Sequence, residues 1–170
     1  MTLREVFAFP NPVNEVAART VAAGVVVMCV ATLATQALWF TAVIAAGFLL
    51  RLASGPTLSP LGQLATRVVA PAIGHAKPVP GPPKRFAQGM GAAMSVAAAL
   101  VWFTTGSALV TSLLLAAITV AAVLESAFAV CLGCHAFALL MRVGVVPESV
   151  CLECADVRGR LDRLLAAESR

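Results

Sequence analysis

Two long stretches of the chain contain no Asp, Glu, Lys or Arg. The first runs from Thr20 to Leu50, and the second runs from Phe86 to Leu124. A helix needs about 20 predominantly apolar residues to cross a bilayer, so the second stretch is long enough for two crossings and the first for one long or two short ones. A soluble domain of this size could not bury so much apolar surface. The pattern therefore predicts an all-α membrane protein.

Small polar residues interrupt both stretches near their middle. Thr104 to Ser107 combines a glycine with three hydroxyl side chains, which is typical of a turn, and Thr35-Gln36 is a weaker candidate in the first stretch. Extending the first stretch past its flanking arginines gives room for two short helices, because their long side chains can reach the interface. We therefore expect four transmembrane helices as two hairpins, over residues 16–52 and 86–136.

The positions of the basic residues support two hairpins over a single first span. All 12 Lys and Arg residues lie outside the expected turns, in blocks before, between and after the two charge-free stretches. Cytoplasmic loops of membrane proteins collect Lys and Arg. The sequence thus predicts a multi-pass protein of the bacterial cytoplasmic membrane with both termini in the cytoplasm. Basic residues at that face suit anionic lipid headgroups, so the net charge of +4 requires no nucleic acid partner.

The remaining segments are expected on the cytoplasmic side, at residues 1–15, 53–85 and 137–170. Ser59-Pro60 is a good helix start, and apolar residues then repeat at helical spacing from Leu61 to Val69, which predicts a short interfacial helix. We expect the Pro-rich linker from Lys77 to Pro83 to be neither helix nor sheet. In the tail, Val157 to Leu165 has the pattern of a C-terminal amphipathic helix.

Four of the five cysteines form two C-x-x-C pairs, Cys131 with Cys134 and Cys151 with Cys154. The spacing between the pairs falls in the range of about 15–20 residues found in zinc ribbons. Four thiolates could close a tetrahedral shell around zinc, which would make the protein a non-catalytic scaffold or assembly subunit. Alternatively, each pair could open and close a disulfide. The reducing cytoplasm argues against permanent structural disulfides here.

Polar residues near the first pair raise further hypotheses. Cys131 to His135 also matches the pattern of covalent c-type haem attachment, but bacteria attach that haem outside the cytoplasmic membrane, whereas the charges place this segment inside. Glu125 is the one carboxylate within an expected span and needs a partner, for which Arg51 is our candidate. A small transporter would have Glu125 alone in its favour, since no other polar group is expected at mid-membrane.

The cysteine motif occurs together with several other short motifs, namely Leu124-Glu125, Phe48 to Arg51, Ser59-Pro60-Leu61 and Lys84 to Ala87. In this combination the chain resembles the uncharacterised bacterial membrane proteins of domain-of-unknown-function family 4395, over roughly Asn11 to Met141. The resemblance implies a four-span membrane domain that ends in a C-x-G-C motif. It also implies a gene neighbourhood that often includes thioredoxin-like or rhodanese-like proteins, but no established activity.

Our leading hypothesis is a membrane-anchored thiol protein that exchanges disulfide or sulfane sulfur with a soluble thioredoxin-like or rhodanese-like partner at the cytoplasmic face. Cys131 and Cys134 would exchange, and Cys151 and Cys154 would act as a relay or resolving pair. The alternative is the scaffold with zinc as its cofactor, held by all four sulfurs.

Overall fold

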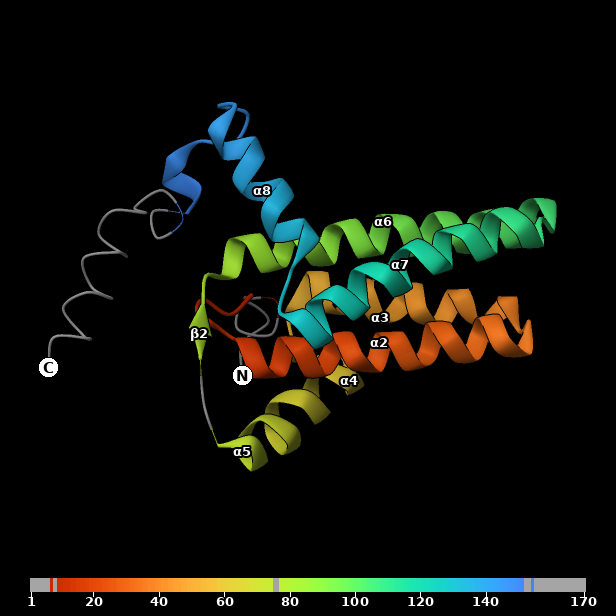
Figure 1. Cartoon of the computed structure of the whole chain (residues 1–170), viewed down its shortest axis with the longest axis horizontal. Helices are drawn as coiled ribbons and strands as arrows, with labels where there is room; N and C mark the ends of the chain where they lie inside the picture. The colour runs from red at the N-terminus through yellow and green to blue at the C-terminus, as the bar shows by residue number, and fades with distance from the viewer. Residues whose placement is uncertain (1–6, 8, 75–76, 152–153, 155–170) are drawn as a thin grey trace, which may run out of the picture.

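Four long helices form the body of the protein in the computed structural model, which describes residues 7, 9–74, 77–151 and 154 (Figure 1). They are α2 (Glu15–Thr35), α3 (Thr41–Ser54), α6 (Gly81–Thr105) and α7 (Ala108–Phe128), and a 3₁₀ turn, η1 (Leu38–Phe40), extends α3 at its start. α2 packs mainly on α7 and α3 mainly on α6, so the two hairpins pack against each other. Both hairpin turns lie at the same end of the bundle.

Shorter elements gather at the opposite end. A two-stranded antiparallel sheet joins β1 (Val13–Asn14) to β2 (Pro78–Val79). A second group of short helices runs along α2, consisting of α4 (Pro60–Leu64), the π-helical turn η2 (Ala65–Val69) and α5 (Ala70–Ile73). After α7 the chain forms α8 (Leu132–Arg142), which packs on α6, and the 3₁₀ turn η3 (Glu148–Val150).

The three longest helices have the length and composition of membrane spans. The mean hydropathy of α2, α6 and α7 reaches 2.0, 1.5 and 2.2, yet only 33%, 17% and 22% of these apolar windows are buried inside the protein. Water strongly disfavours such continuous exposed apolar surface, whereas lipid accommodates it. The chain is thus a helical multi-pass membrane protein. Leu38–Ser54 is also apolar, but it is shorter than the other three.

The two turns lie where the sequence predicts them. Gln36 adopts a left-handed conformation with φ of 54° and ends α2. Gly106, with φ of 65°, ends α6 and donates its N–H to the carbonyl of Trp102, after which Ser107 precedes α7. A left-handed residue at this position is a common way to stop a helix.

The expectation for the Pro-rich linker is wrong. Pro78 and Val79 form a strand, and α6 begins at Gly81 instead of Phe86. Proline has no N–H, but the first turn of a helix requires none, so Pro82 and Pro83 fit there. Gly81 also packs closely on the N-terminal segment, because a Cβ atom on it would lie 2.6 Å from the carbonyl oxygen of Pro10.

The expected interfacial helix begins as predicted, since the Ser59 hydroxyl accepts a hydrogen bond from the N–H of Gly62 at 3.2 Å. Its apolar residues then separate into two groups. Ala65 and Ala70 pack against α2, whereas Leu64 and Val68 are 50% and 57% exposed. The expected C-terminal amphipathic helix at Val157 to Leu165 lies outside the described residues.

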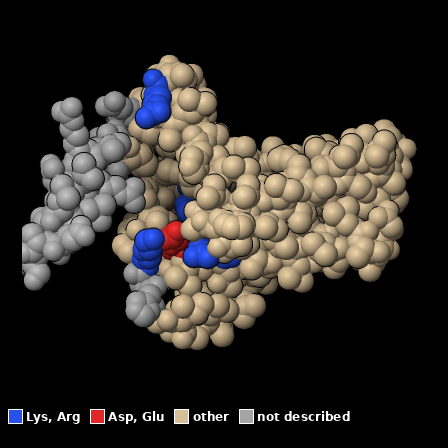
Figure 2. Space-filling model, in the orientation of Figure 1, with Lys and Arg blue, Asp and Glu red and all other residues tan. Residues whose placement is uncertain are grey.

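The core of the bundle is apolar and closely packed. The Phe48 ring lies against Gly91 of α6, where a Cβ atom would overlap it. Cys29 is fully buried in this core among Val25, Ile44 and Leu115. The core thus holds the hairpins together, and the charged groups lie at the end of the bundle that carries α8 (Figure 2).

Candidate functional site

A sharp reversal after α7 positions the first cysteine pair outside the apolar helices. Ala129 adopts a left-handed conformation with φ of 58° and ends α7. The Arg19 guanidinium donates hydrogen bonds to the carbonyls of Ser126 at 3.0 Å and Ala127 at 3.2 Å. A cation is favourable at the negative end of a helix dipole. The second hairpin therefore ends before the 136 boundary expected from sequence, and Cys131 starts a separate helix.

Cys131 occupies the N-cap position of α8. Its sulfur accepts a hydrogen bond from the backbone N–H of Cys134 at 3.4 Å, and its carbonyl accepts one from the N–H of His135 at 3.1 Å. The His135 ring also lies close, with Nδ1 2.9 Å from the same carbonyl. Cys131 is 6% exposed, whereas Cys134 is partly exposed. The helix N-terminus thus favours negative charge on the more buried sulfur.

Only glycine fits directly before Cys134, because α6 lies too close for a larger residue. A Cβ atom on Gly133 would lie 2.5 Å from Cβ and 2.6 Å from Cα of Ala87, so a larger residue cannot fit without moving α8 away from α6. One turn further on, the Phe137 ring packs on Phe86 with ring centroids 5.7 Å apart. These contacts hold the start of α8 against the start of α6.

An ion pair lies beside the cysteines. Lys84 Nζ is 2.6 Å from Glu125 Oε1, and the two side chains are only 13% and 17% exposed. Our expectation that Arg51 pairs with Glu125 is wrong. Because α6 begins earlier than expected, Lys84 stands on the helix beside α7, while Arg51 Nε donates to Gln88 Oε1 at 3.0 Å.

Neighbouring groups shift the pKa values of the two thiols in opposite directions. A hydrogen bond from the Cys134 thiol, helped by the nearby Lys84 charge and the Cys134 N–H, lowers the pKa of Cys131 to about 7, although burial and Glu125 oppose this. The pKa of Cys134 is raised, first by its hydrogen bond to Cys131 and then by burial. Near neutral pH the pair can therefore hold one proton on Cys134 and one negative charge on Cys131.

The second cysteine pair forms a separate unit. A disulfide joins Cys151 to Cys154, with Cα atoms 5.3 Å apart, whereas Cys131 and Cys134 are free thiols. The structure does not bring the four sulfurs together as a zinc site requires. Within the described ranges, no three His, Cys, Asp or Glu side chains lie close enough to share a metal ion.

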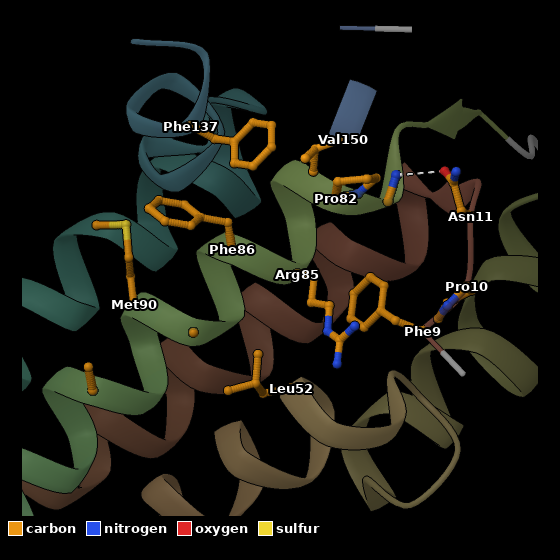
Figure 3. A pocket seen from close by; sticks show the side chains of 13 residues that line it. Phe9, Pro10, Asn11, Leu52, Pro82, Arg85, Phe86, Met90, Phe137 and Val150 are labelled. Atoms are coloured by element: carbon orange, nitrogen blue, oxygen red, sulfur yellow. Dashed lines mark hydrogen bonds between the residues drawn. The ribbon is translucent and has the colours of Figure 1, made fainter. Parts of the chain in front are cut away.

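Two cavities lie at this end of the bundle, and the smaller of them is lined by Cys131. One, of about 270 Å³, lies between Cys131, Glu125 and the bundle interior. The other is an apolar groove of about 670 Å³ between α6, α8 and the N-terminal segment (Figure 3). Phe86 and Phe137 form one side of the groove, and Arg85 lies over the Phe9 ring at 5.8 Å. Val150, which precedes the disulfide, also contributes to its wall.

Sequence reasoning found the cysteines but missed their electrostatic partner. Lys84 falls in the segment 53–85 that was expected in the cytoplasm, so no pattern suggested that it faces Glu125. A usable signal was present, since prolines directly before Lys84 suit the first turn of a helix, and a helix from that point would carry Lys84 toward the membrane end of α7.

Comparisons with known proteins agree with the resemblance in the sequence. Searches of curated proteins and of solved structures gave no match. The family model described as Domain of unknown function (DUF4395) matches residues 13–142, which include α2 to α8 and the first cysteine pair and end before Cys151. Because this match covers most of the sequence, the chain belongs to the DUF4395 family.

Proposed function

We propose that the protein is a membrane-anchored thiol protein that exchanges disulfide or sulfane sulfur with a soluble thioredoxin-like or rhodanese-like partner at the cytoplasmic face. The observation that supports this best is the state of the first pair. Cys131 caps the N-terminus of α8, where hydrogen bonds from the partly exposed Cys134 lower the pKa of Cys131 to about 7. A low-pKa thiol next to a second cysteine is typical of thiol exchange.

The proposal includes four membrane spans, with η1 and α3 as the second. Leu38–Ser54 is about 25 Å long, a little short of the ~30 Å hydrocarbon core, and such a helix can be accommodated by local thinning of the bilayer. Trp39, at the turn end, is 57% exposed and suits an interfacial position.

Charge distribution supports the orientation. Figure 2 shows Lys, Arg, Asp and Glu gathered at the end of the molecule that carries α8, while the rest of this face is uncharged. Both turns at the other end lack basic residues. By the positive-inside rule, the cysteine end lies in the cytoplasm of a bacterial cell.

Differences in exposure and acidity between the sulfurs suggest the order of events. In the oxidised pair, a thiolate of a reduced partner attacks Cys134 Sγ, the Cys131–Cys134 bond breaks, and Cys131 leaves as the stabilised thiolate. The partner's second thiolate then attacks the partner sulfur of this mixed disulfide, forms the partner's disulfide and releases Cys134, which takes up a proton. Two electrons pass from the partner to the pair. A leaving thiolate of low pKa accelerates this exchange.

Sulfane sulfur transfer would use the same thiolate. Cys131 would attack the outer sulfur of a partner persulfide, take that sulfur and release the partner's thiolate, with no net change in electron count. The Cys151–Cys154 disulfide is in the oxidised state and could accept two electrons from the reduced first pair, which would then close to a disulfide. In a reducing cytoplasm such a relay suits the second pair better than a permanent structural role.

The test measures whether Cys131 and Cys134 recover free thiols or gain a sulfur atom when they meet a partner protein. The detergent-purified protein is oxidised, incubated with excess reduced thioredoxin, quenched in acid, alkylated and weighed as peptides. We expect Cys131 and Cys134 to recover two alkylatable thiols. For sulfur transfer, the protein is first reduced and freed of reductant, and a persulfidated rhodanese should then add one sulfur to Cys131 and be released as its thiolate. Cys29→Ser is the control and should behave like the unaltered protein. If neither protein changes the first pair, the proposal is wrong.

A further inference from the structure

We infer that a partly open cavity at the end of α3 binds a tetrahedral oxyanion through the buried Arg51, either a free sulfate or phosphate ion or the phosphate of an anionic lipid. Arg51 is 4% exposed. Its Nε donates to Gln88 Oε1 at 3.0 Å, its Nη1 donates to Ser59 Oγ at 3.4 Å, and the guanidinium lies over the Phe48 ring at 4.6 Å. The remaining nitrogen, Nη2, is buried without a hydrogen-bond partner.

The described part of the chain provides no counter-ion for this guanidinium. Glu15 pairs with Lys77 at 3.0 Å, and Glu125 pairs with Lys84 at 2.6 Å. Gln88 and Ser59 offer only neutral oxygens. A buried charge with an unused donor is costly unless an opposite charge meets it, and charged groups at membrane depth usually mark a binding site or an ion path.

A cavity beside Arg51 has room for such a charge. It measures about 160 Å³ and lies among α2, the end of α3, α4 and the start of α6, with Pro10 to Asn14 along one side. Polar wall residues include Gln88, Thr66 and Asn14, and Lys84 adds a second cation whose charge Glu125 already meets. Among the described residues that line it, none carries a carboxylate. Its electrostatic character therefore favours a small anion over a cation or an apolar group.

Guanidinium geometry indicates which anion. Arginine binds oxyanions through fixed N–H groups, and it is the preferred side chain for phosphate and similar groups. The cavity lies at the basic end of the bundle, where anionic headgroups gather in a bilayer. It shares Ala18, Val21 and Gln88 with the cavity beside Cys131, but the inference depends on Arg51 alone and goes beyond the thiol chemistry.

Direct binding tests the inference. The full chain is delipidated in neutral detergent, a phosphorus assay confirms lipid removal, and equilibrium dialysis follows radiolabelled sulfate and phosphate. We expect one anion per chain, and binding weaker by about tenfold or more in Arg51→Gln. Arg67→Gln, which removes an exposed cation from the neighbouring helix, should bind like the unaltered chain. Absence of binding, or equal binding in Arg51→Gln, overturns the inference.

Two more variants keep the test decisive if Arg51→Gln fails to fold. Gln88→Glu keeps the side-chain volume and places a carboxylate beside Arg51, so it should fold and lose anion binding. Glu5 lies outside the described residues, and Glu5→Gln should leave binding unchanged. Anion binding that emerges only in Glu5→Gln would show that the chain supplies its own carboxylate, which contradicts the inference.

A competition experiment distinguishes a lipid phosphate from a free ion as the ligand. Sulfate binding is repeated in nanodiscs of phosphatidylcholine and of phosphatidylglycerol. Loss of labelled sulfate in phosphatidylglycerol alone identifies a lipid phosphate as the ligand, and equal binding in both identifies a free ion. Either result supports the oxyanion site. If labelled sulfate binds in neither kind of nanodisc and also fails to bind in detergent, the inference is wrong.

Discussion

Gly133 shows how one residue determines the position of the cysteine pair. Its missing side chain lets α8 approach the backbone of α6 at Ala87. Cys131 can then serve as the N-cap of α8 while it lies within the electrostatic influence of Lys84 and Glu125. The cysteine spacing was visible in the sequence, but the need for glycine between them depends on a contact between distant segments.

Replacing that glycine should loosen the site. We expect Gly133→Ala to lower the free energy of unfolding by about 1–3 kcal/mol, because the added Cβ atom meets the Ala87 backbone at 2.6 Å. Thermal unfolding in detergent measures the effect. Gly89→Ala is the matched control on α6, since its Cβ atom would lie 3.7 Å from Leu52, an ordinary contact. Equal loss in both variants would contradict the steric argument.

The acidity of Cys131 gives a second residue-scale prediction. In a chain whose other cysteines except Cys134 are replaced by serine, the rate of alkylation of Cys131 should rise with pH around a midpoint near 7. The thiolate is the reactive form, and the hydrogen bond from Cys134 stabilises it. Cys134→Ala removes that bond, so the midpoint should move upward toward the ordinary value of 9.0. An unchanged midpoint would show that the neighbouring thiol does not set the acidity.

At the scale of elements, the sequence predicted the turn that ends α6 correctly but did not predict where α6 begins. Thr104 to Ser107 contains strong helix breakers, so the second turn was correctly predicted. Pro78 to Pro83 contains breakers too, but proline breaks only a helix that has already begun. Here Pro82 and Pro83 occupy the first turn of α6 and Pro78 lies in β2, and the linker prediction failed for that reason. Pairing β2 with β1 then required a partner strand far away in the sequence.

The Lys84–Glu125 pair joins α6 to α7 and should be important for stability. Lys84→Met leaves Glu125 buried without a partner, and we expect a loss of about 3–5 kcal/mol in the free energy of unfolding. Lys84→Met combined with Glu125→Gln removes both charges and should recover most of that loss. Unfolding in detergent of both single variants and the double variant gives the coupling energy. Additive losses would show that the pair does not couple the helices.

At the scale of the whole molecule, composition and charge-free stretches were enough to predict a multi-pass helical membrane protein. Three helices have the required length, while the fourth apolar segment is shorter. Sequence alone could not show which helices would pack together. The pairing of α2 with α7 and of α3 with α6 depends on close contacts such as Gly91 with Phe48.

Orientation can be tested on cells. In a chain whose one cysteine is Cys134, a membrane-impermeant thiol reagent should label permeabilised cells and leave intact cells unlabelled, because the basic end of the bundle is expected in the cytoplasm. A chain without its native cysteines that carries Thr105→Cys, at the exposed turn on the opposite end, is the matched control and should be labelled in intact cells. Labelling of Cys134 from outside would reverse the proposed topology.

The N-cap role of Cys131 links electron transfer to the shape of the molecule. A thiolate at this position accepts the Cys134 N–H and stabilises the first turn of α8. Closing a bond between the two sulfurs would withdraw that charged acceptor and weaken the contact of α8 with its neighbours. Gain or loss of two electrons would then alter the aromatic wall formed by Phe86 and Phe137, and a soluble protein touching that wall could distinguish the two redox forms without reaching either sulfur.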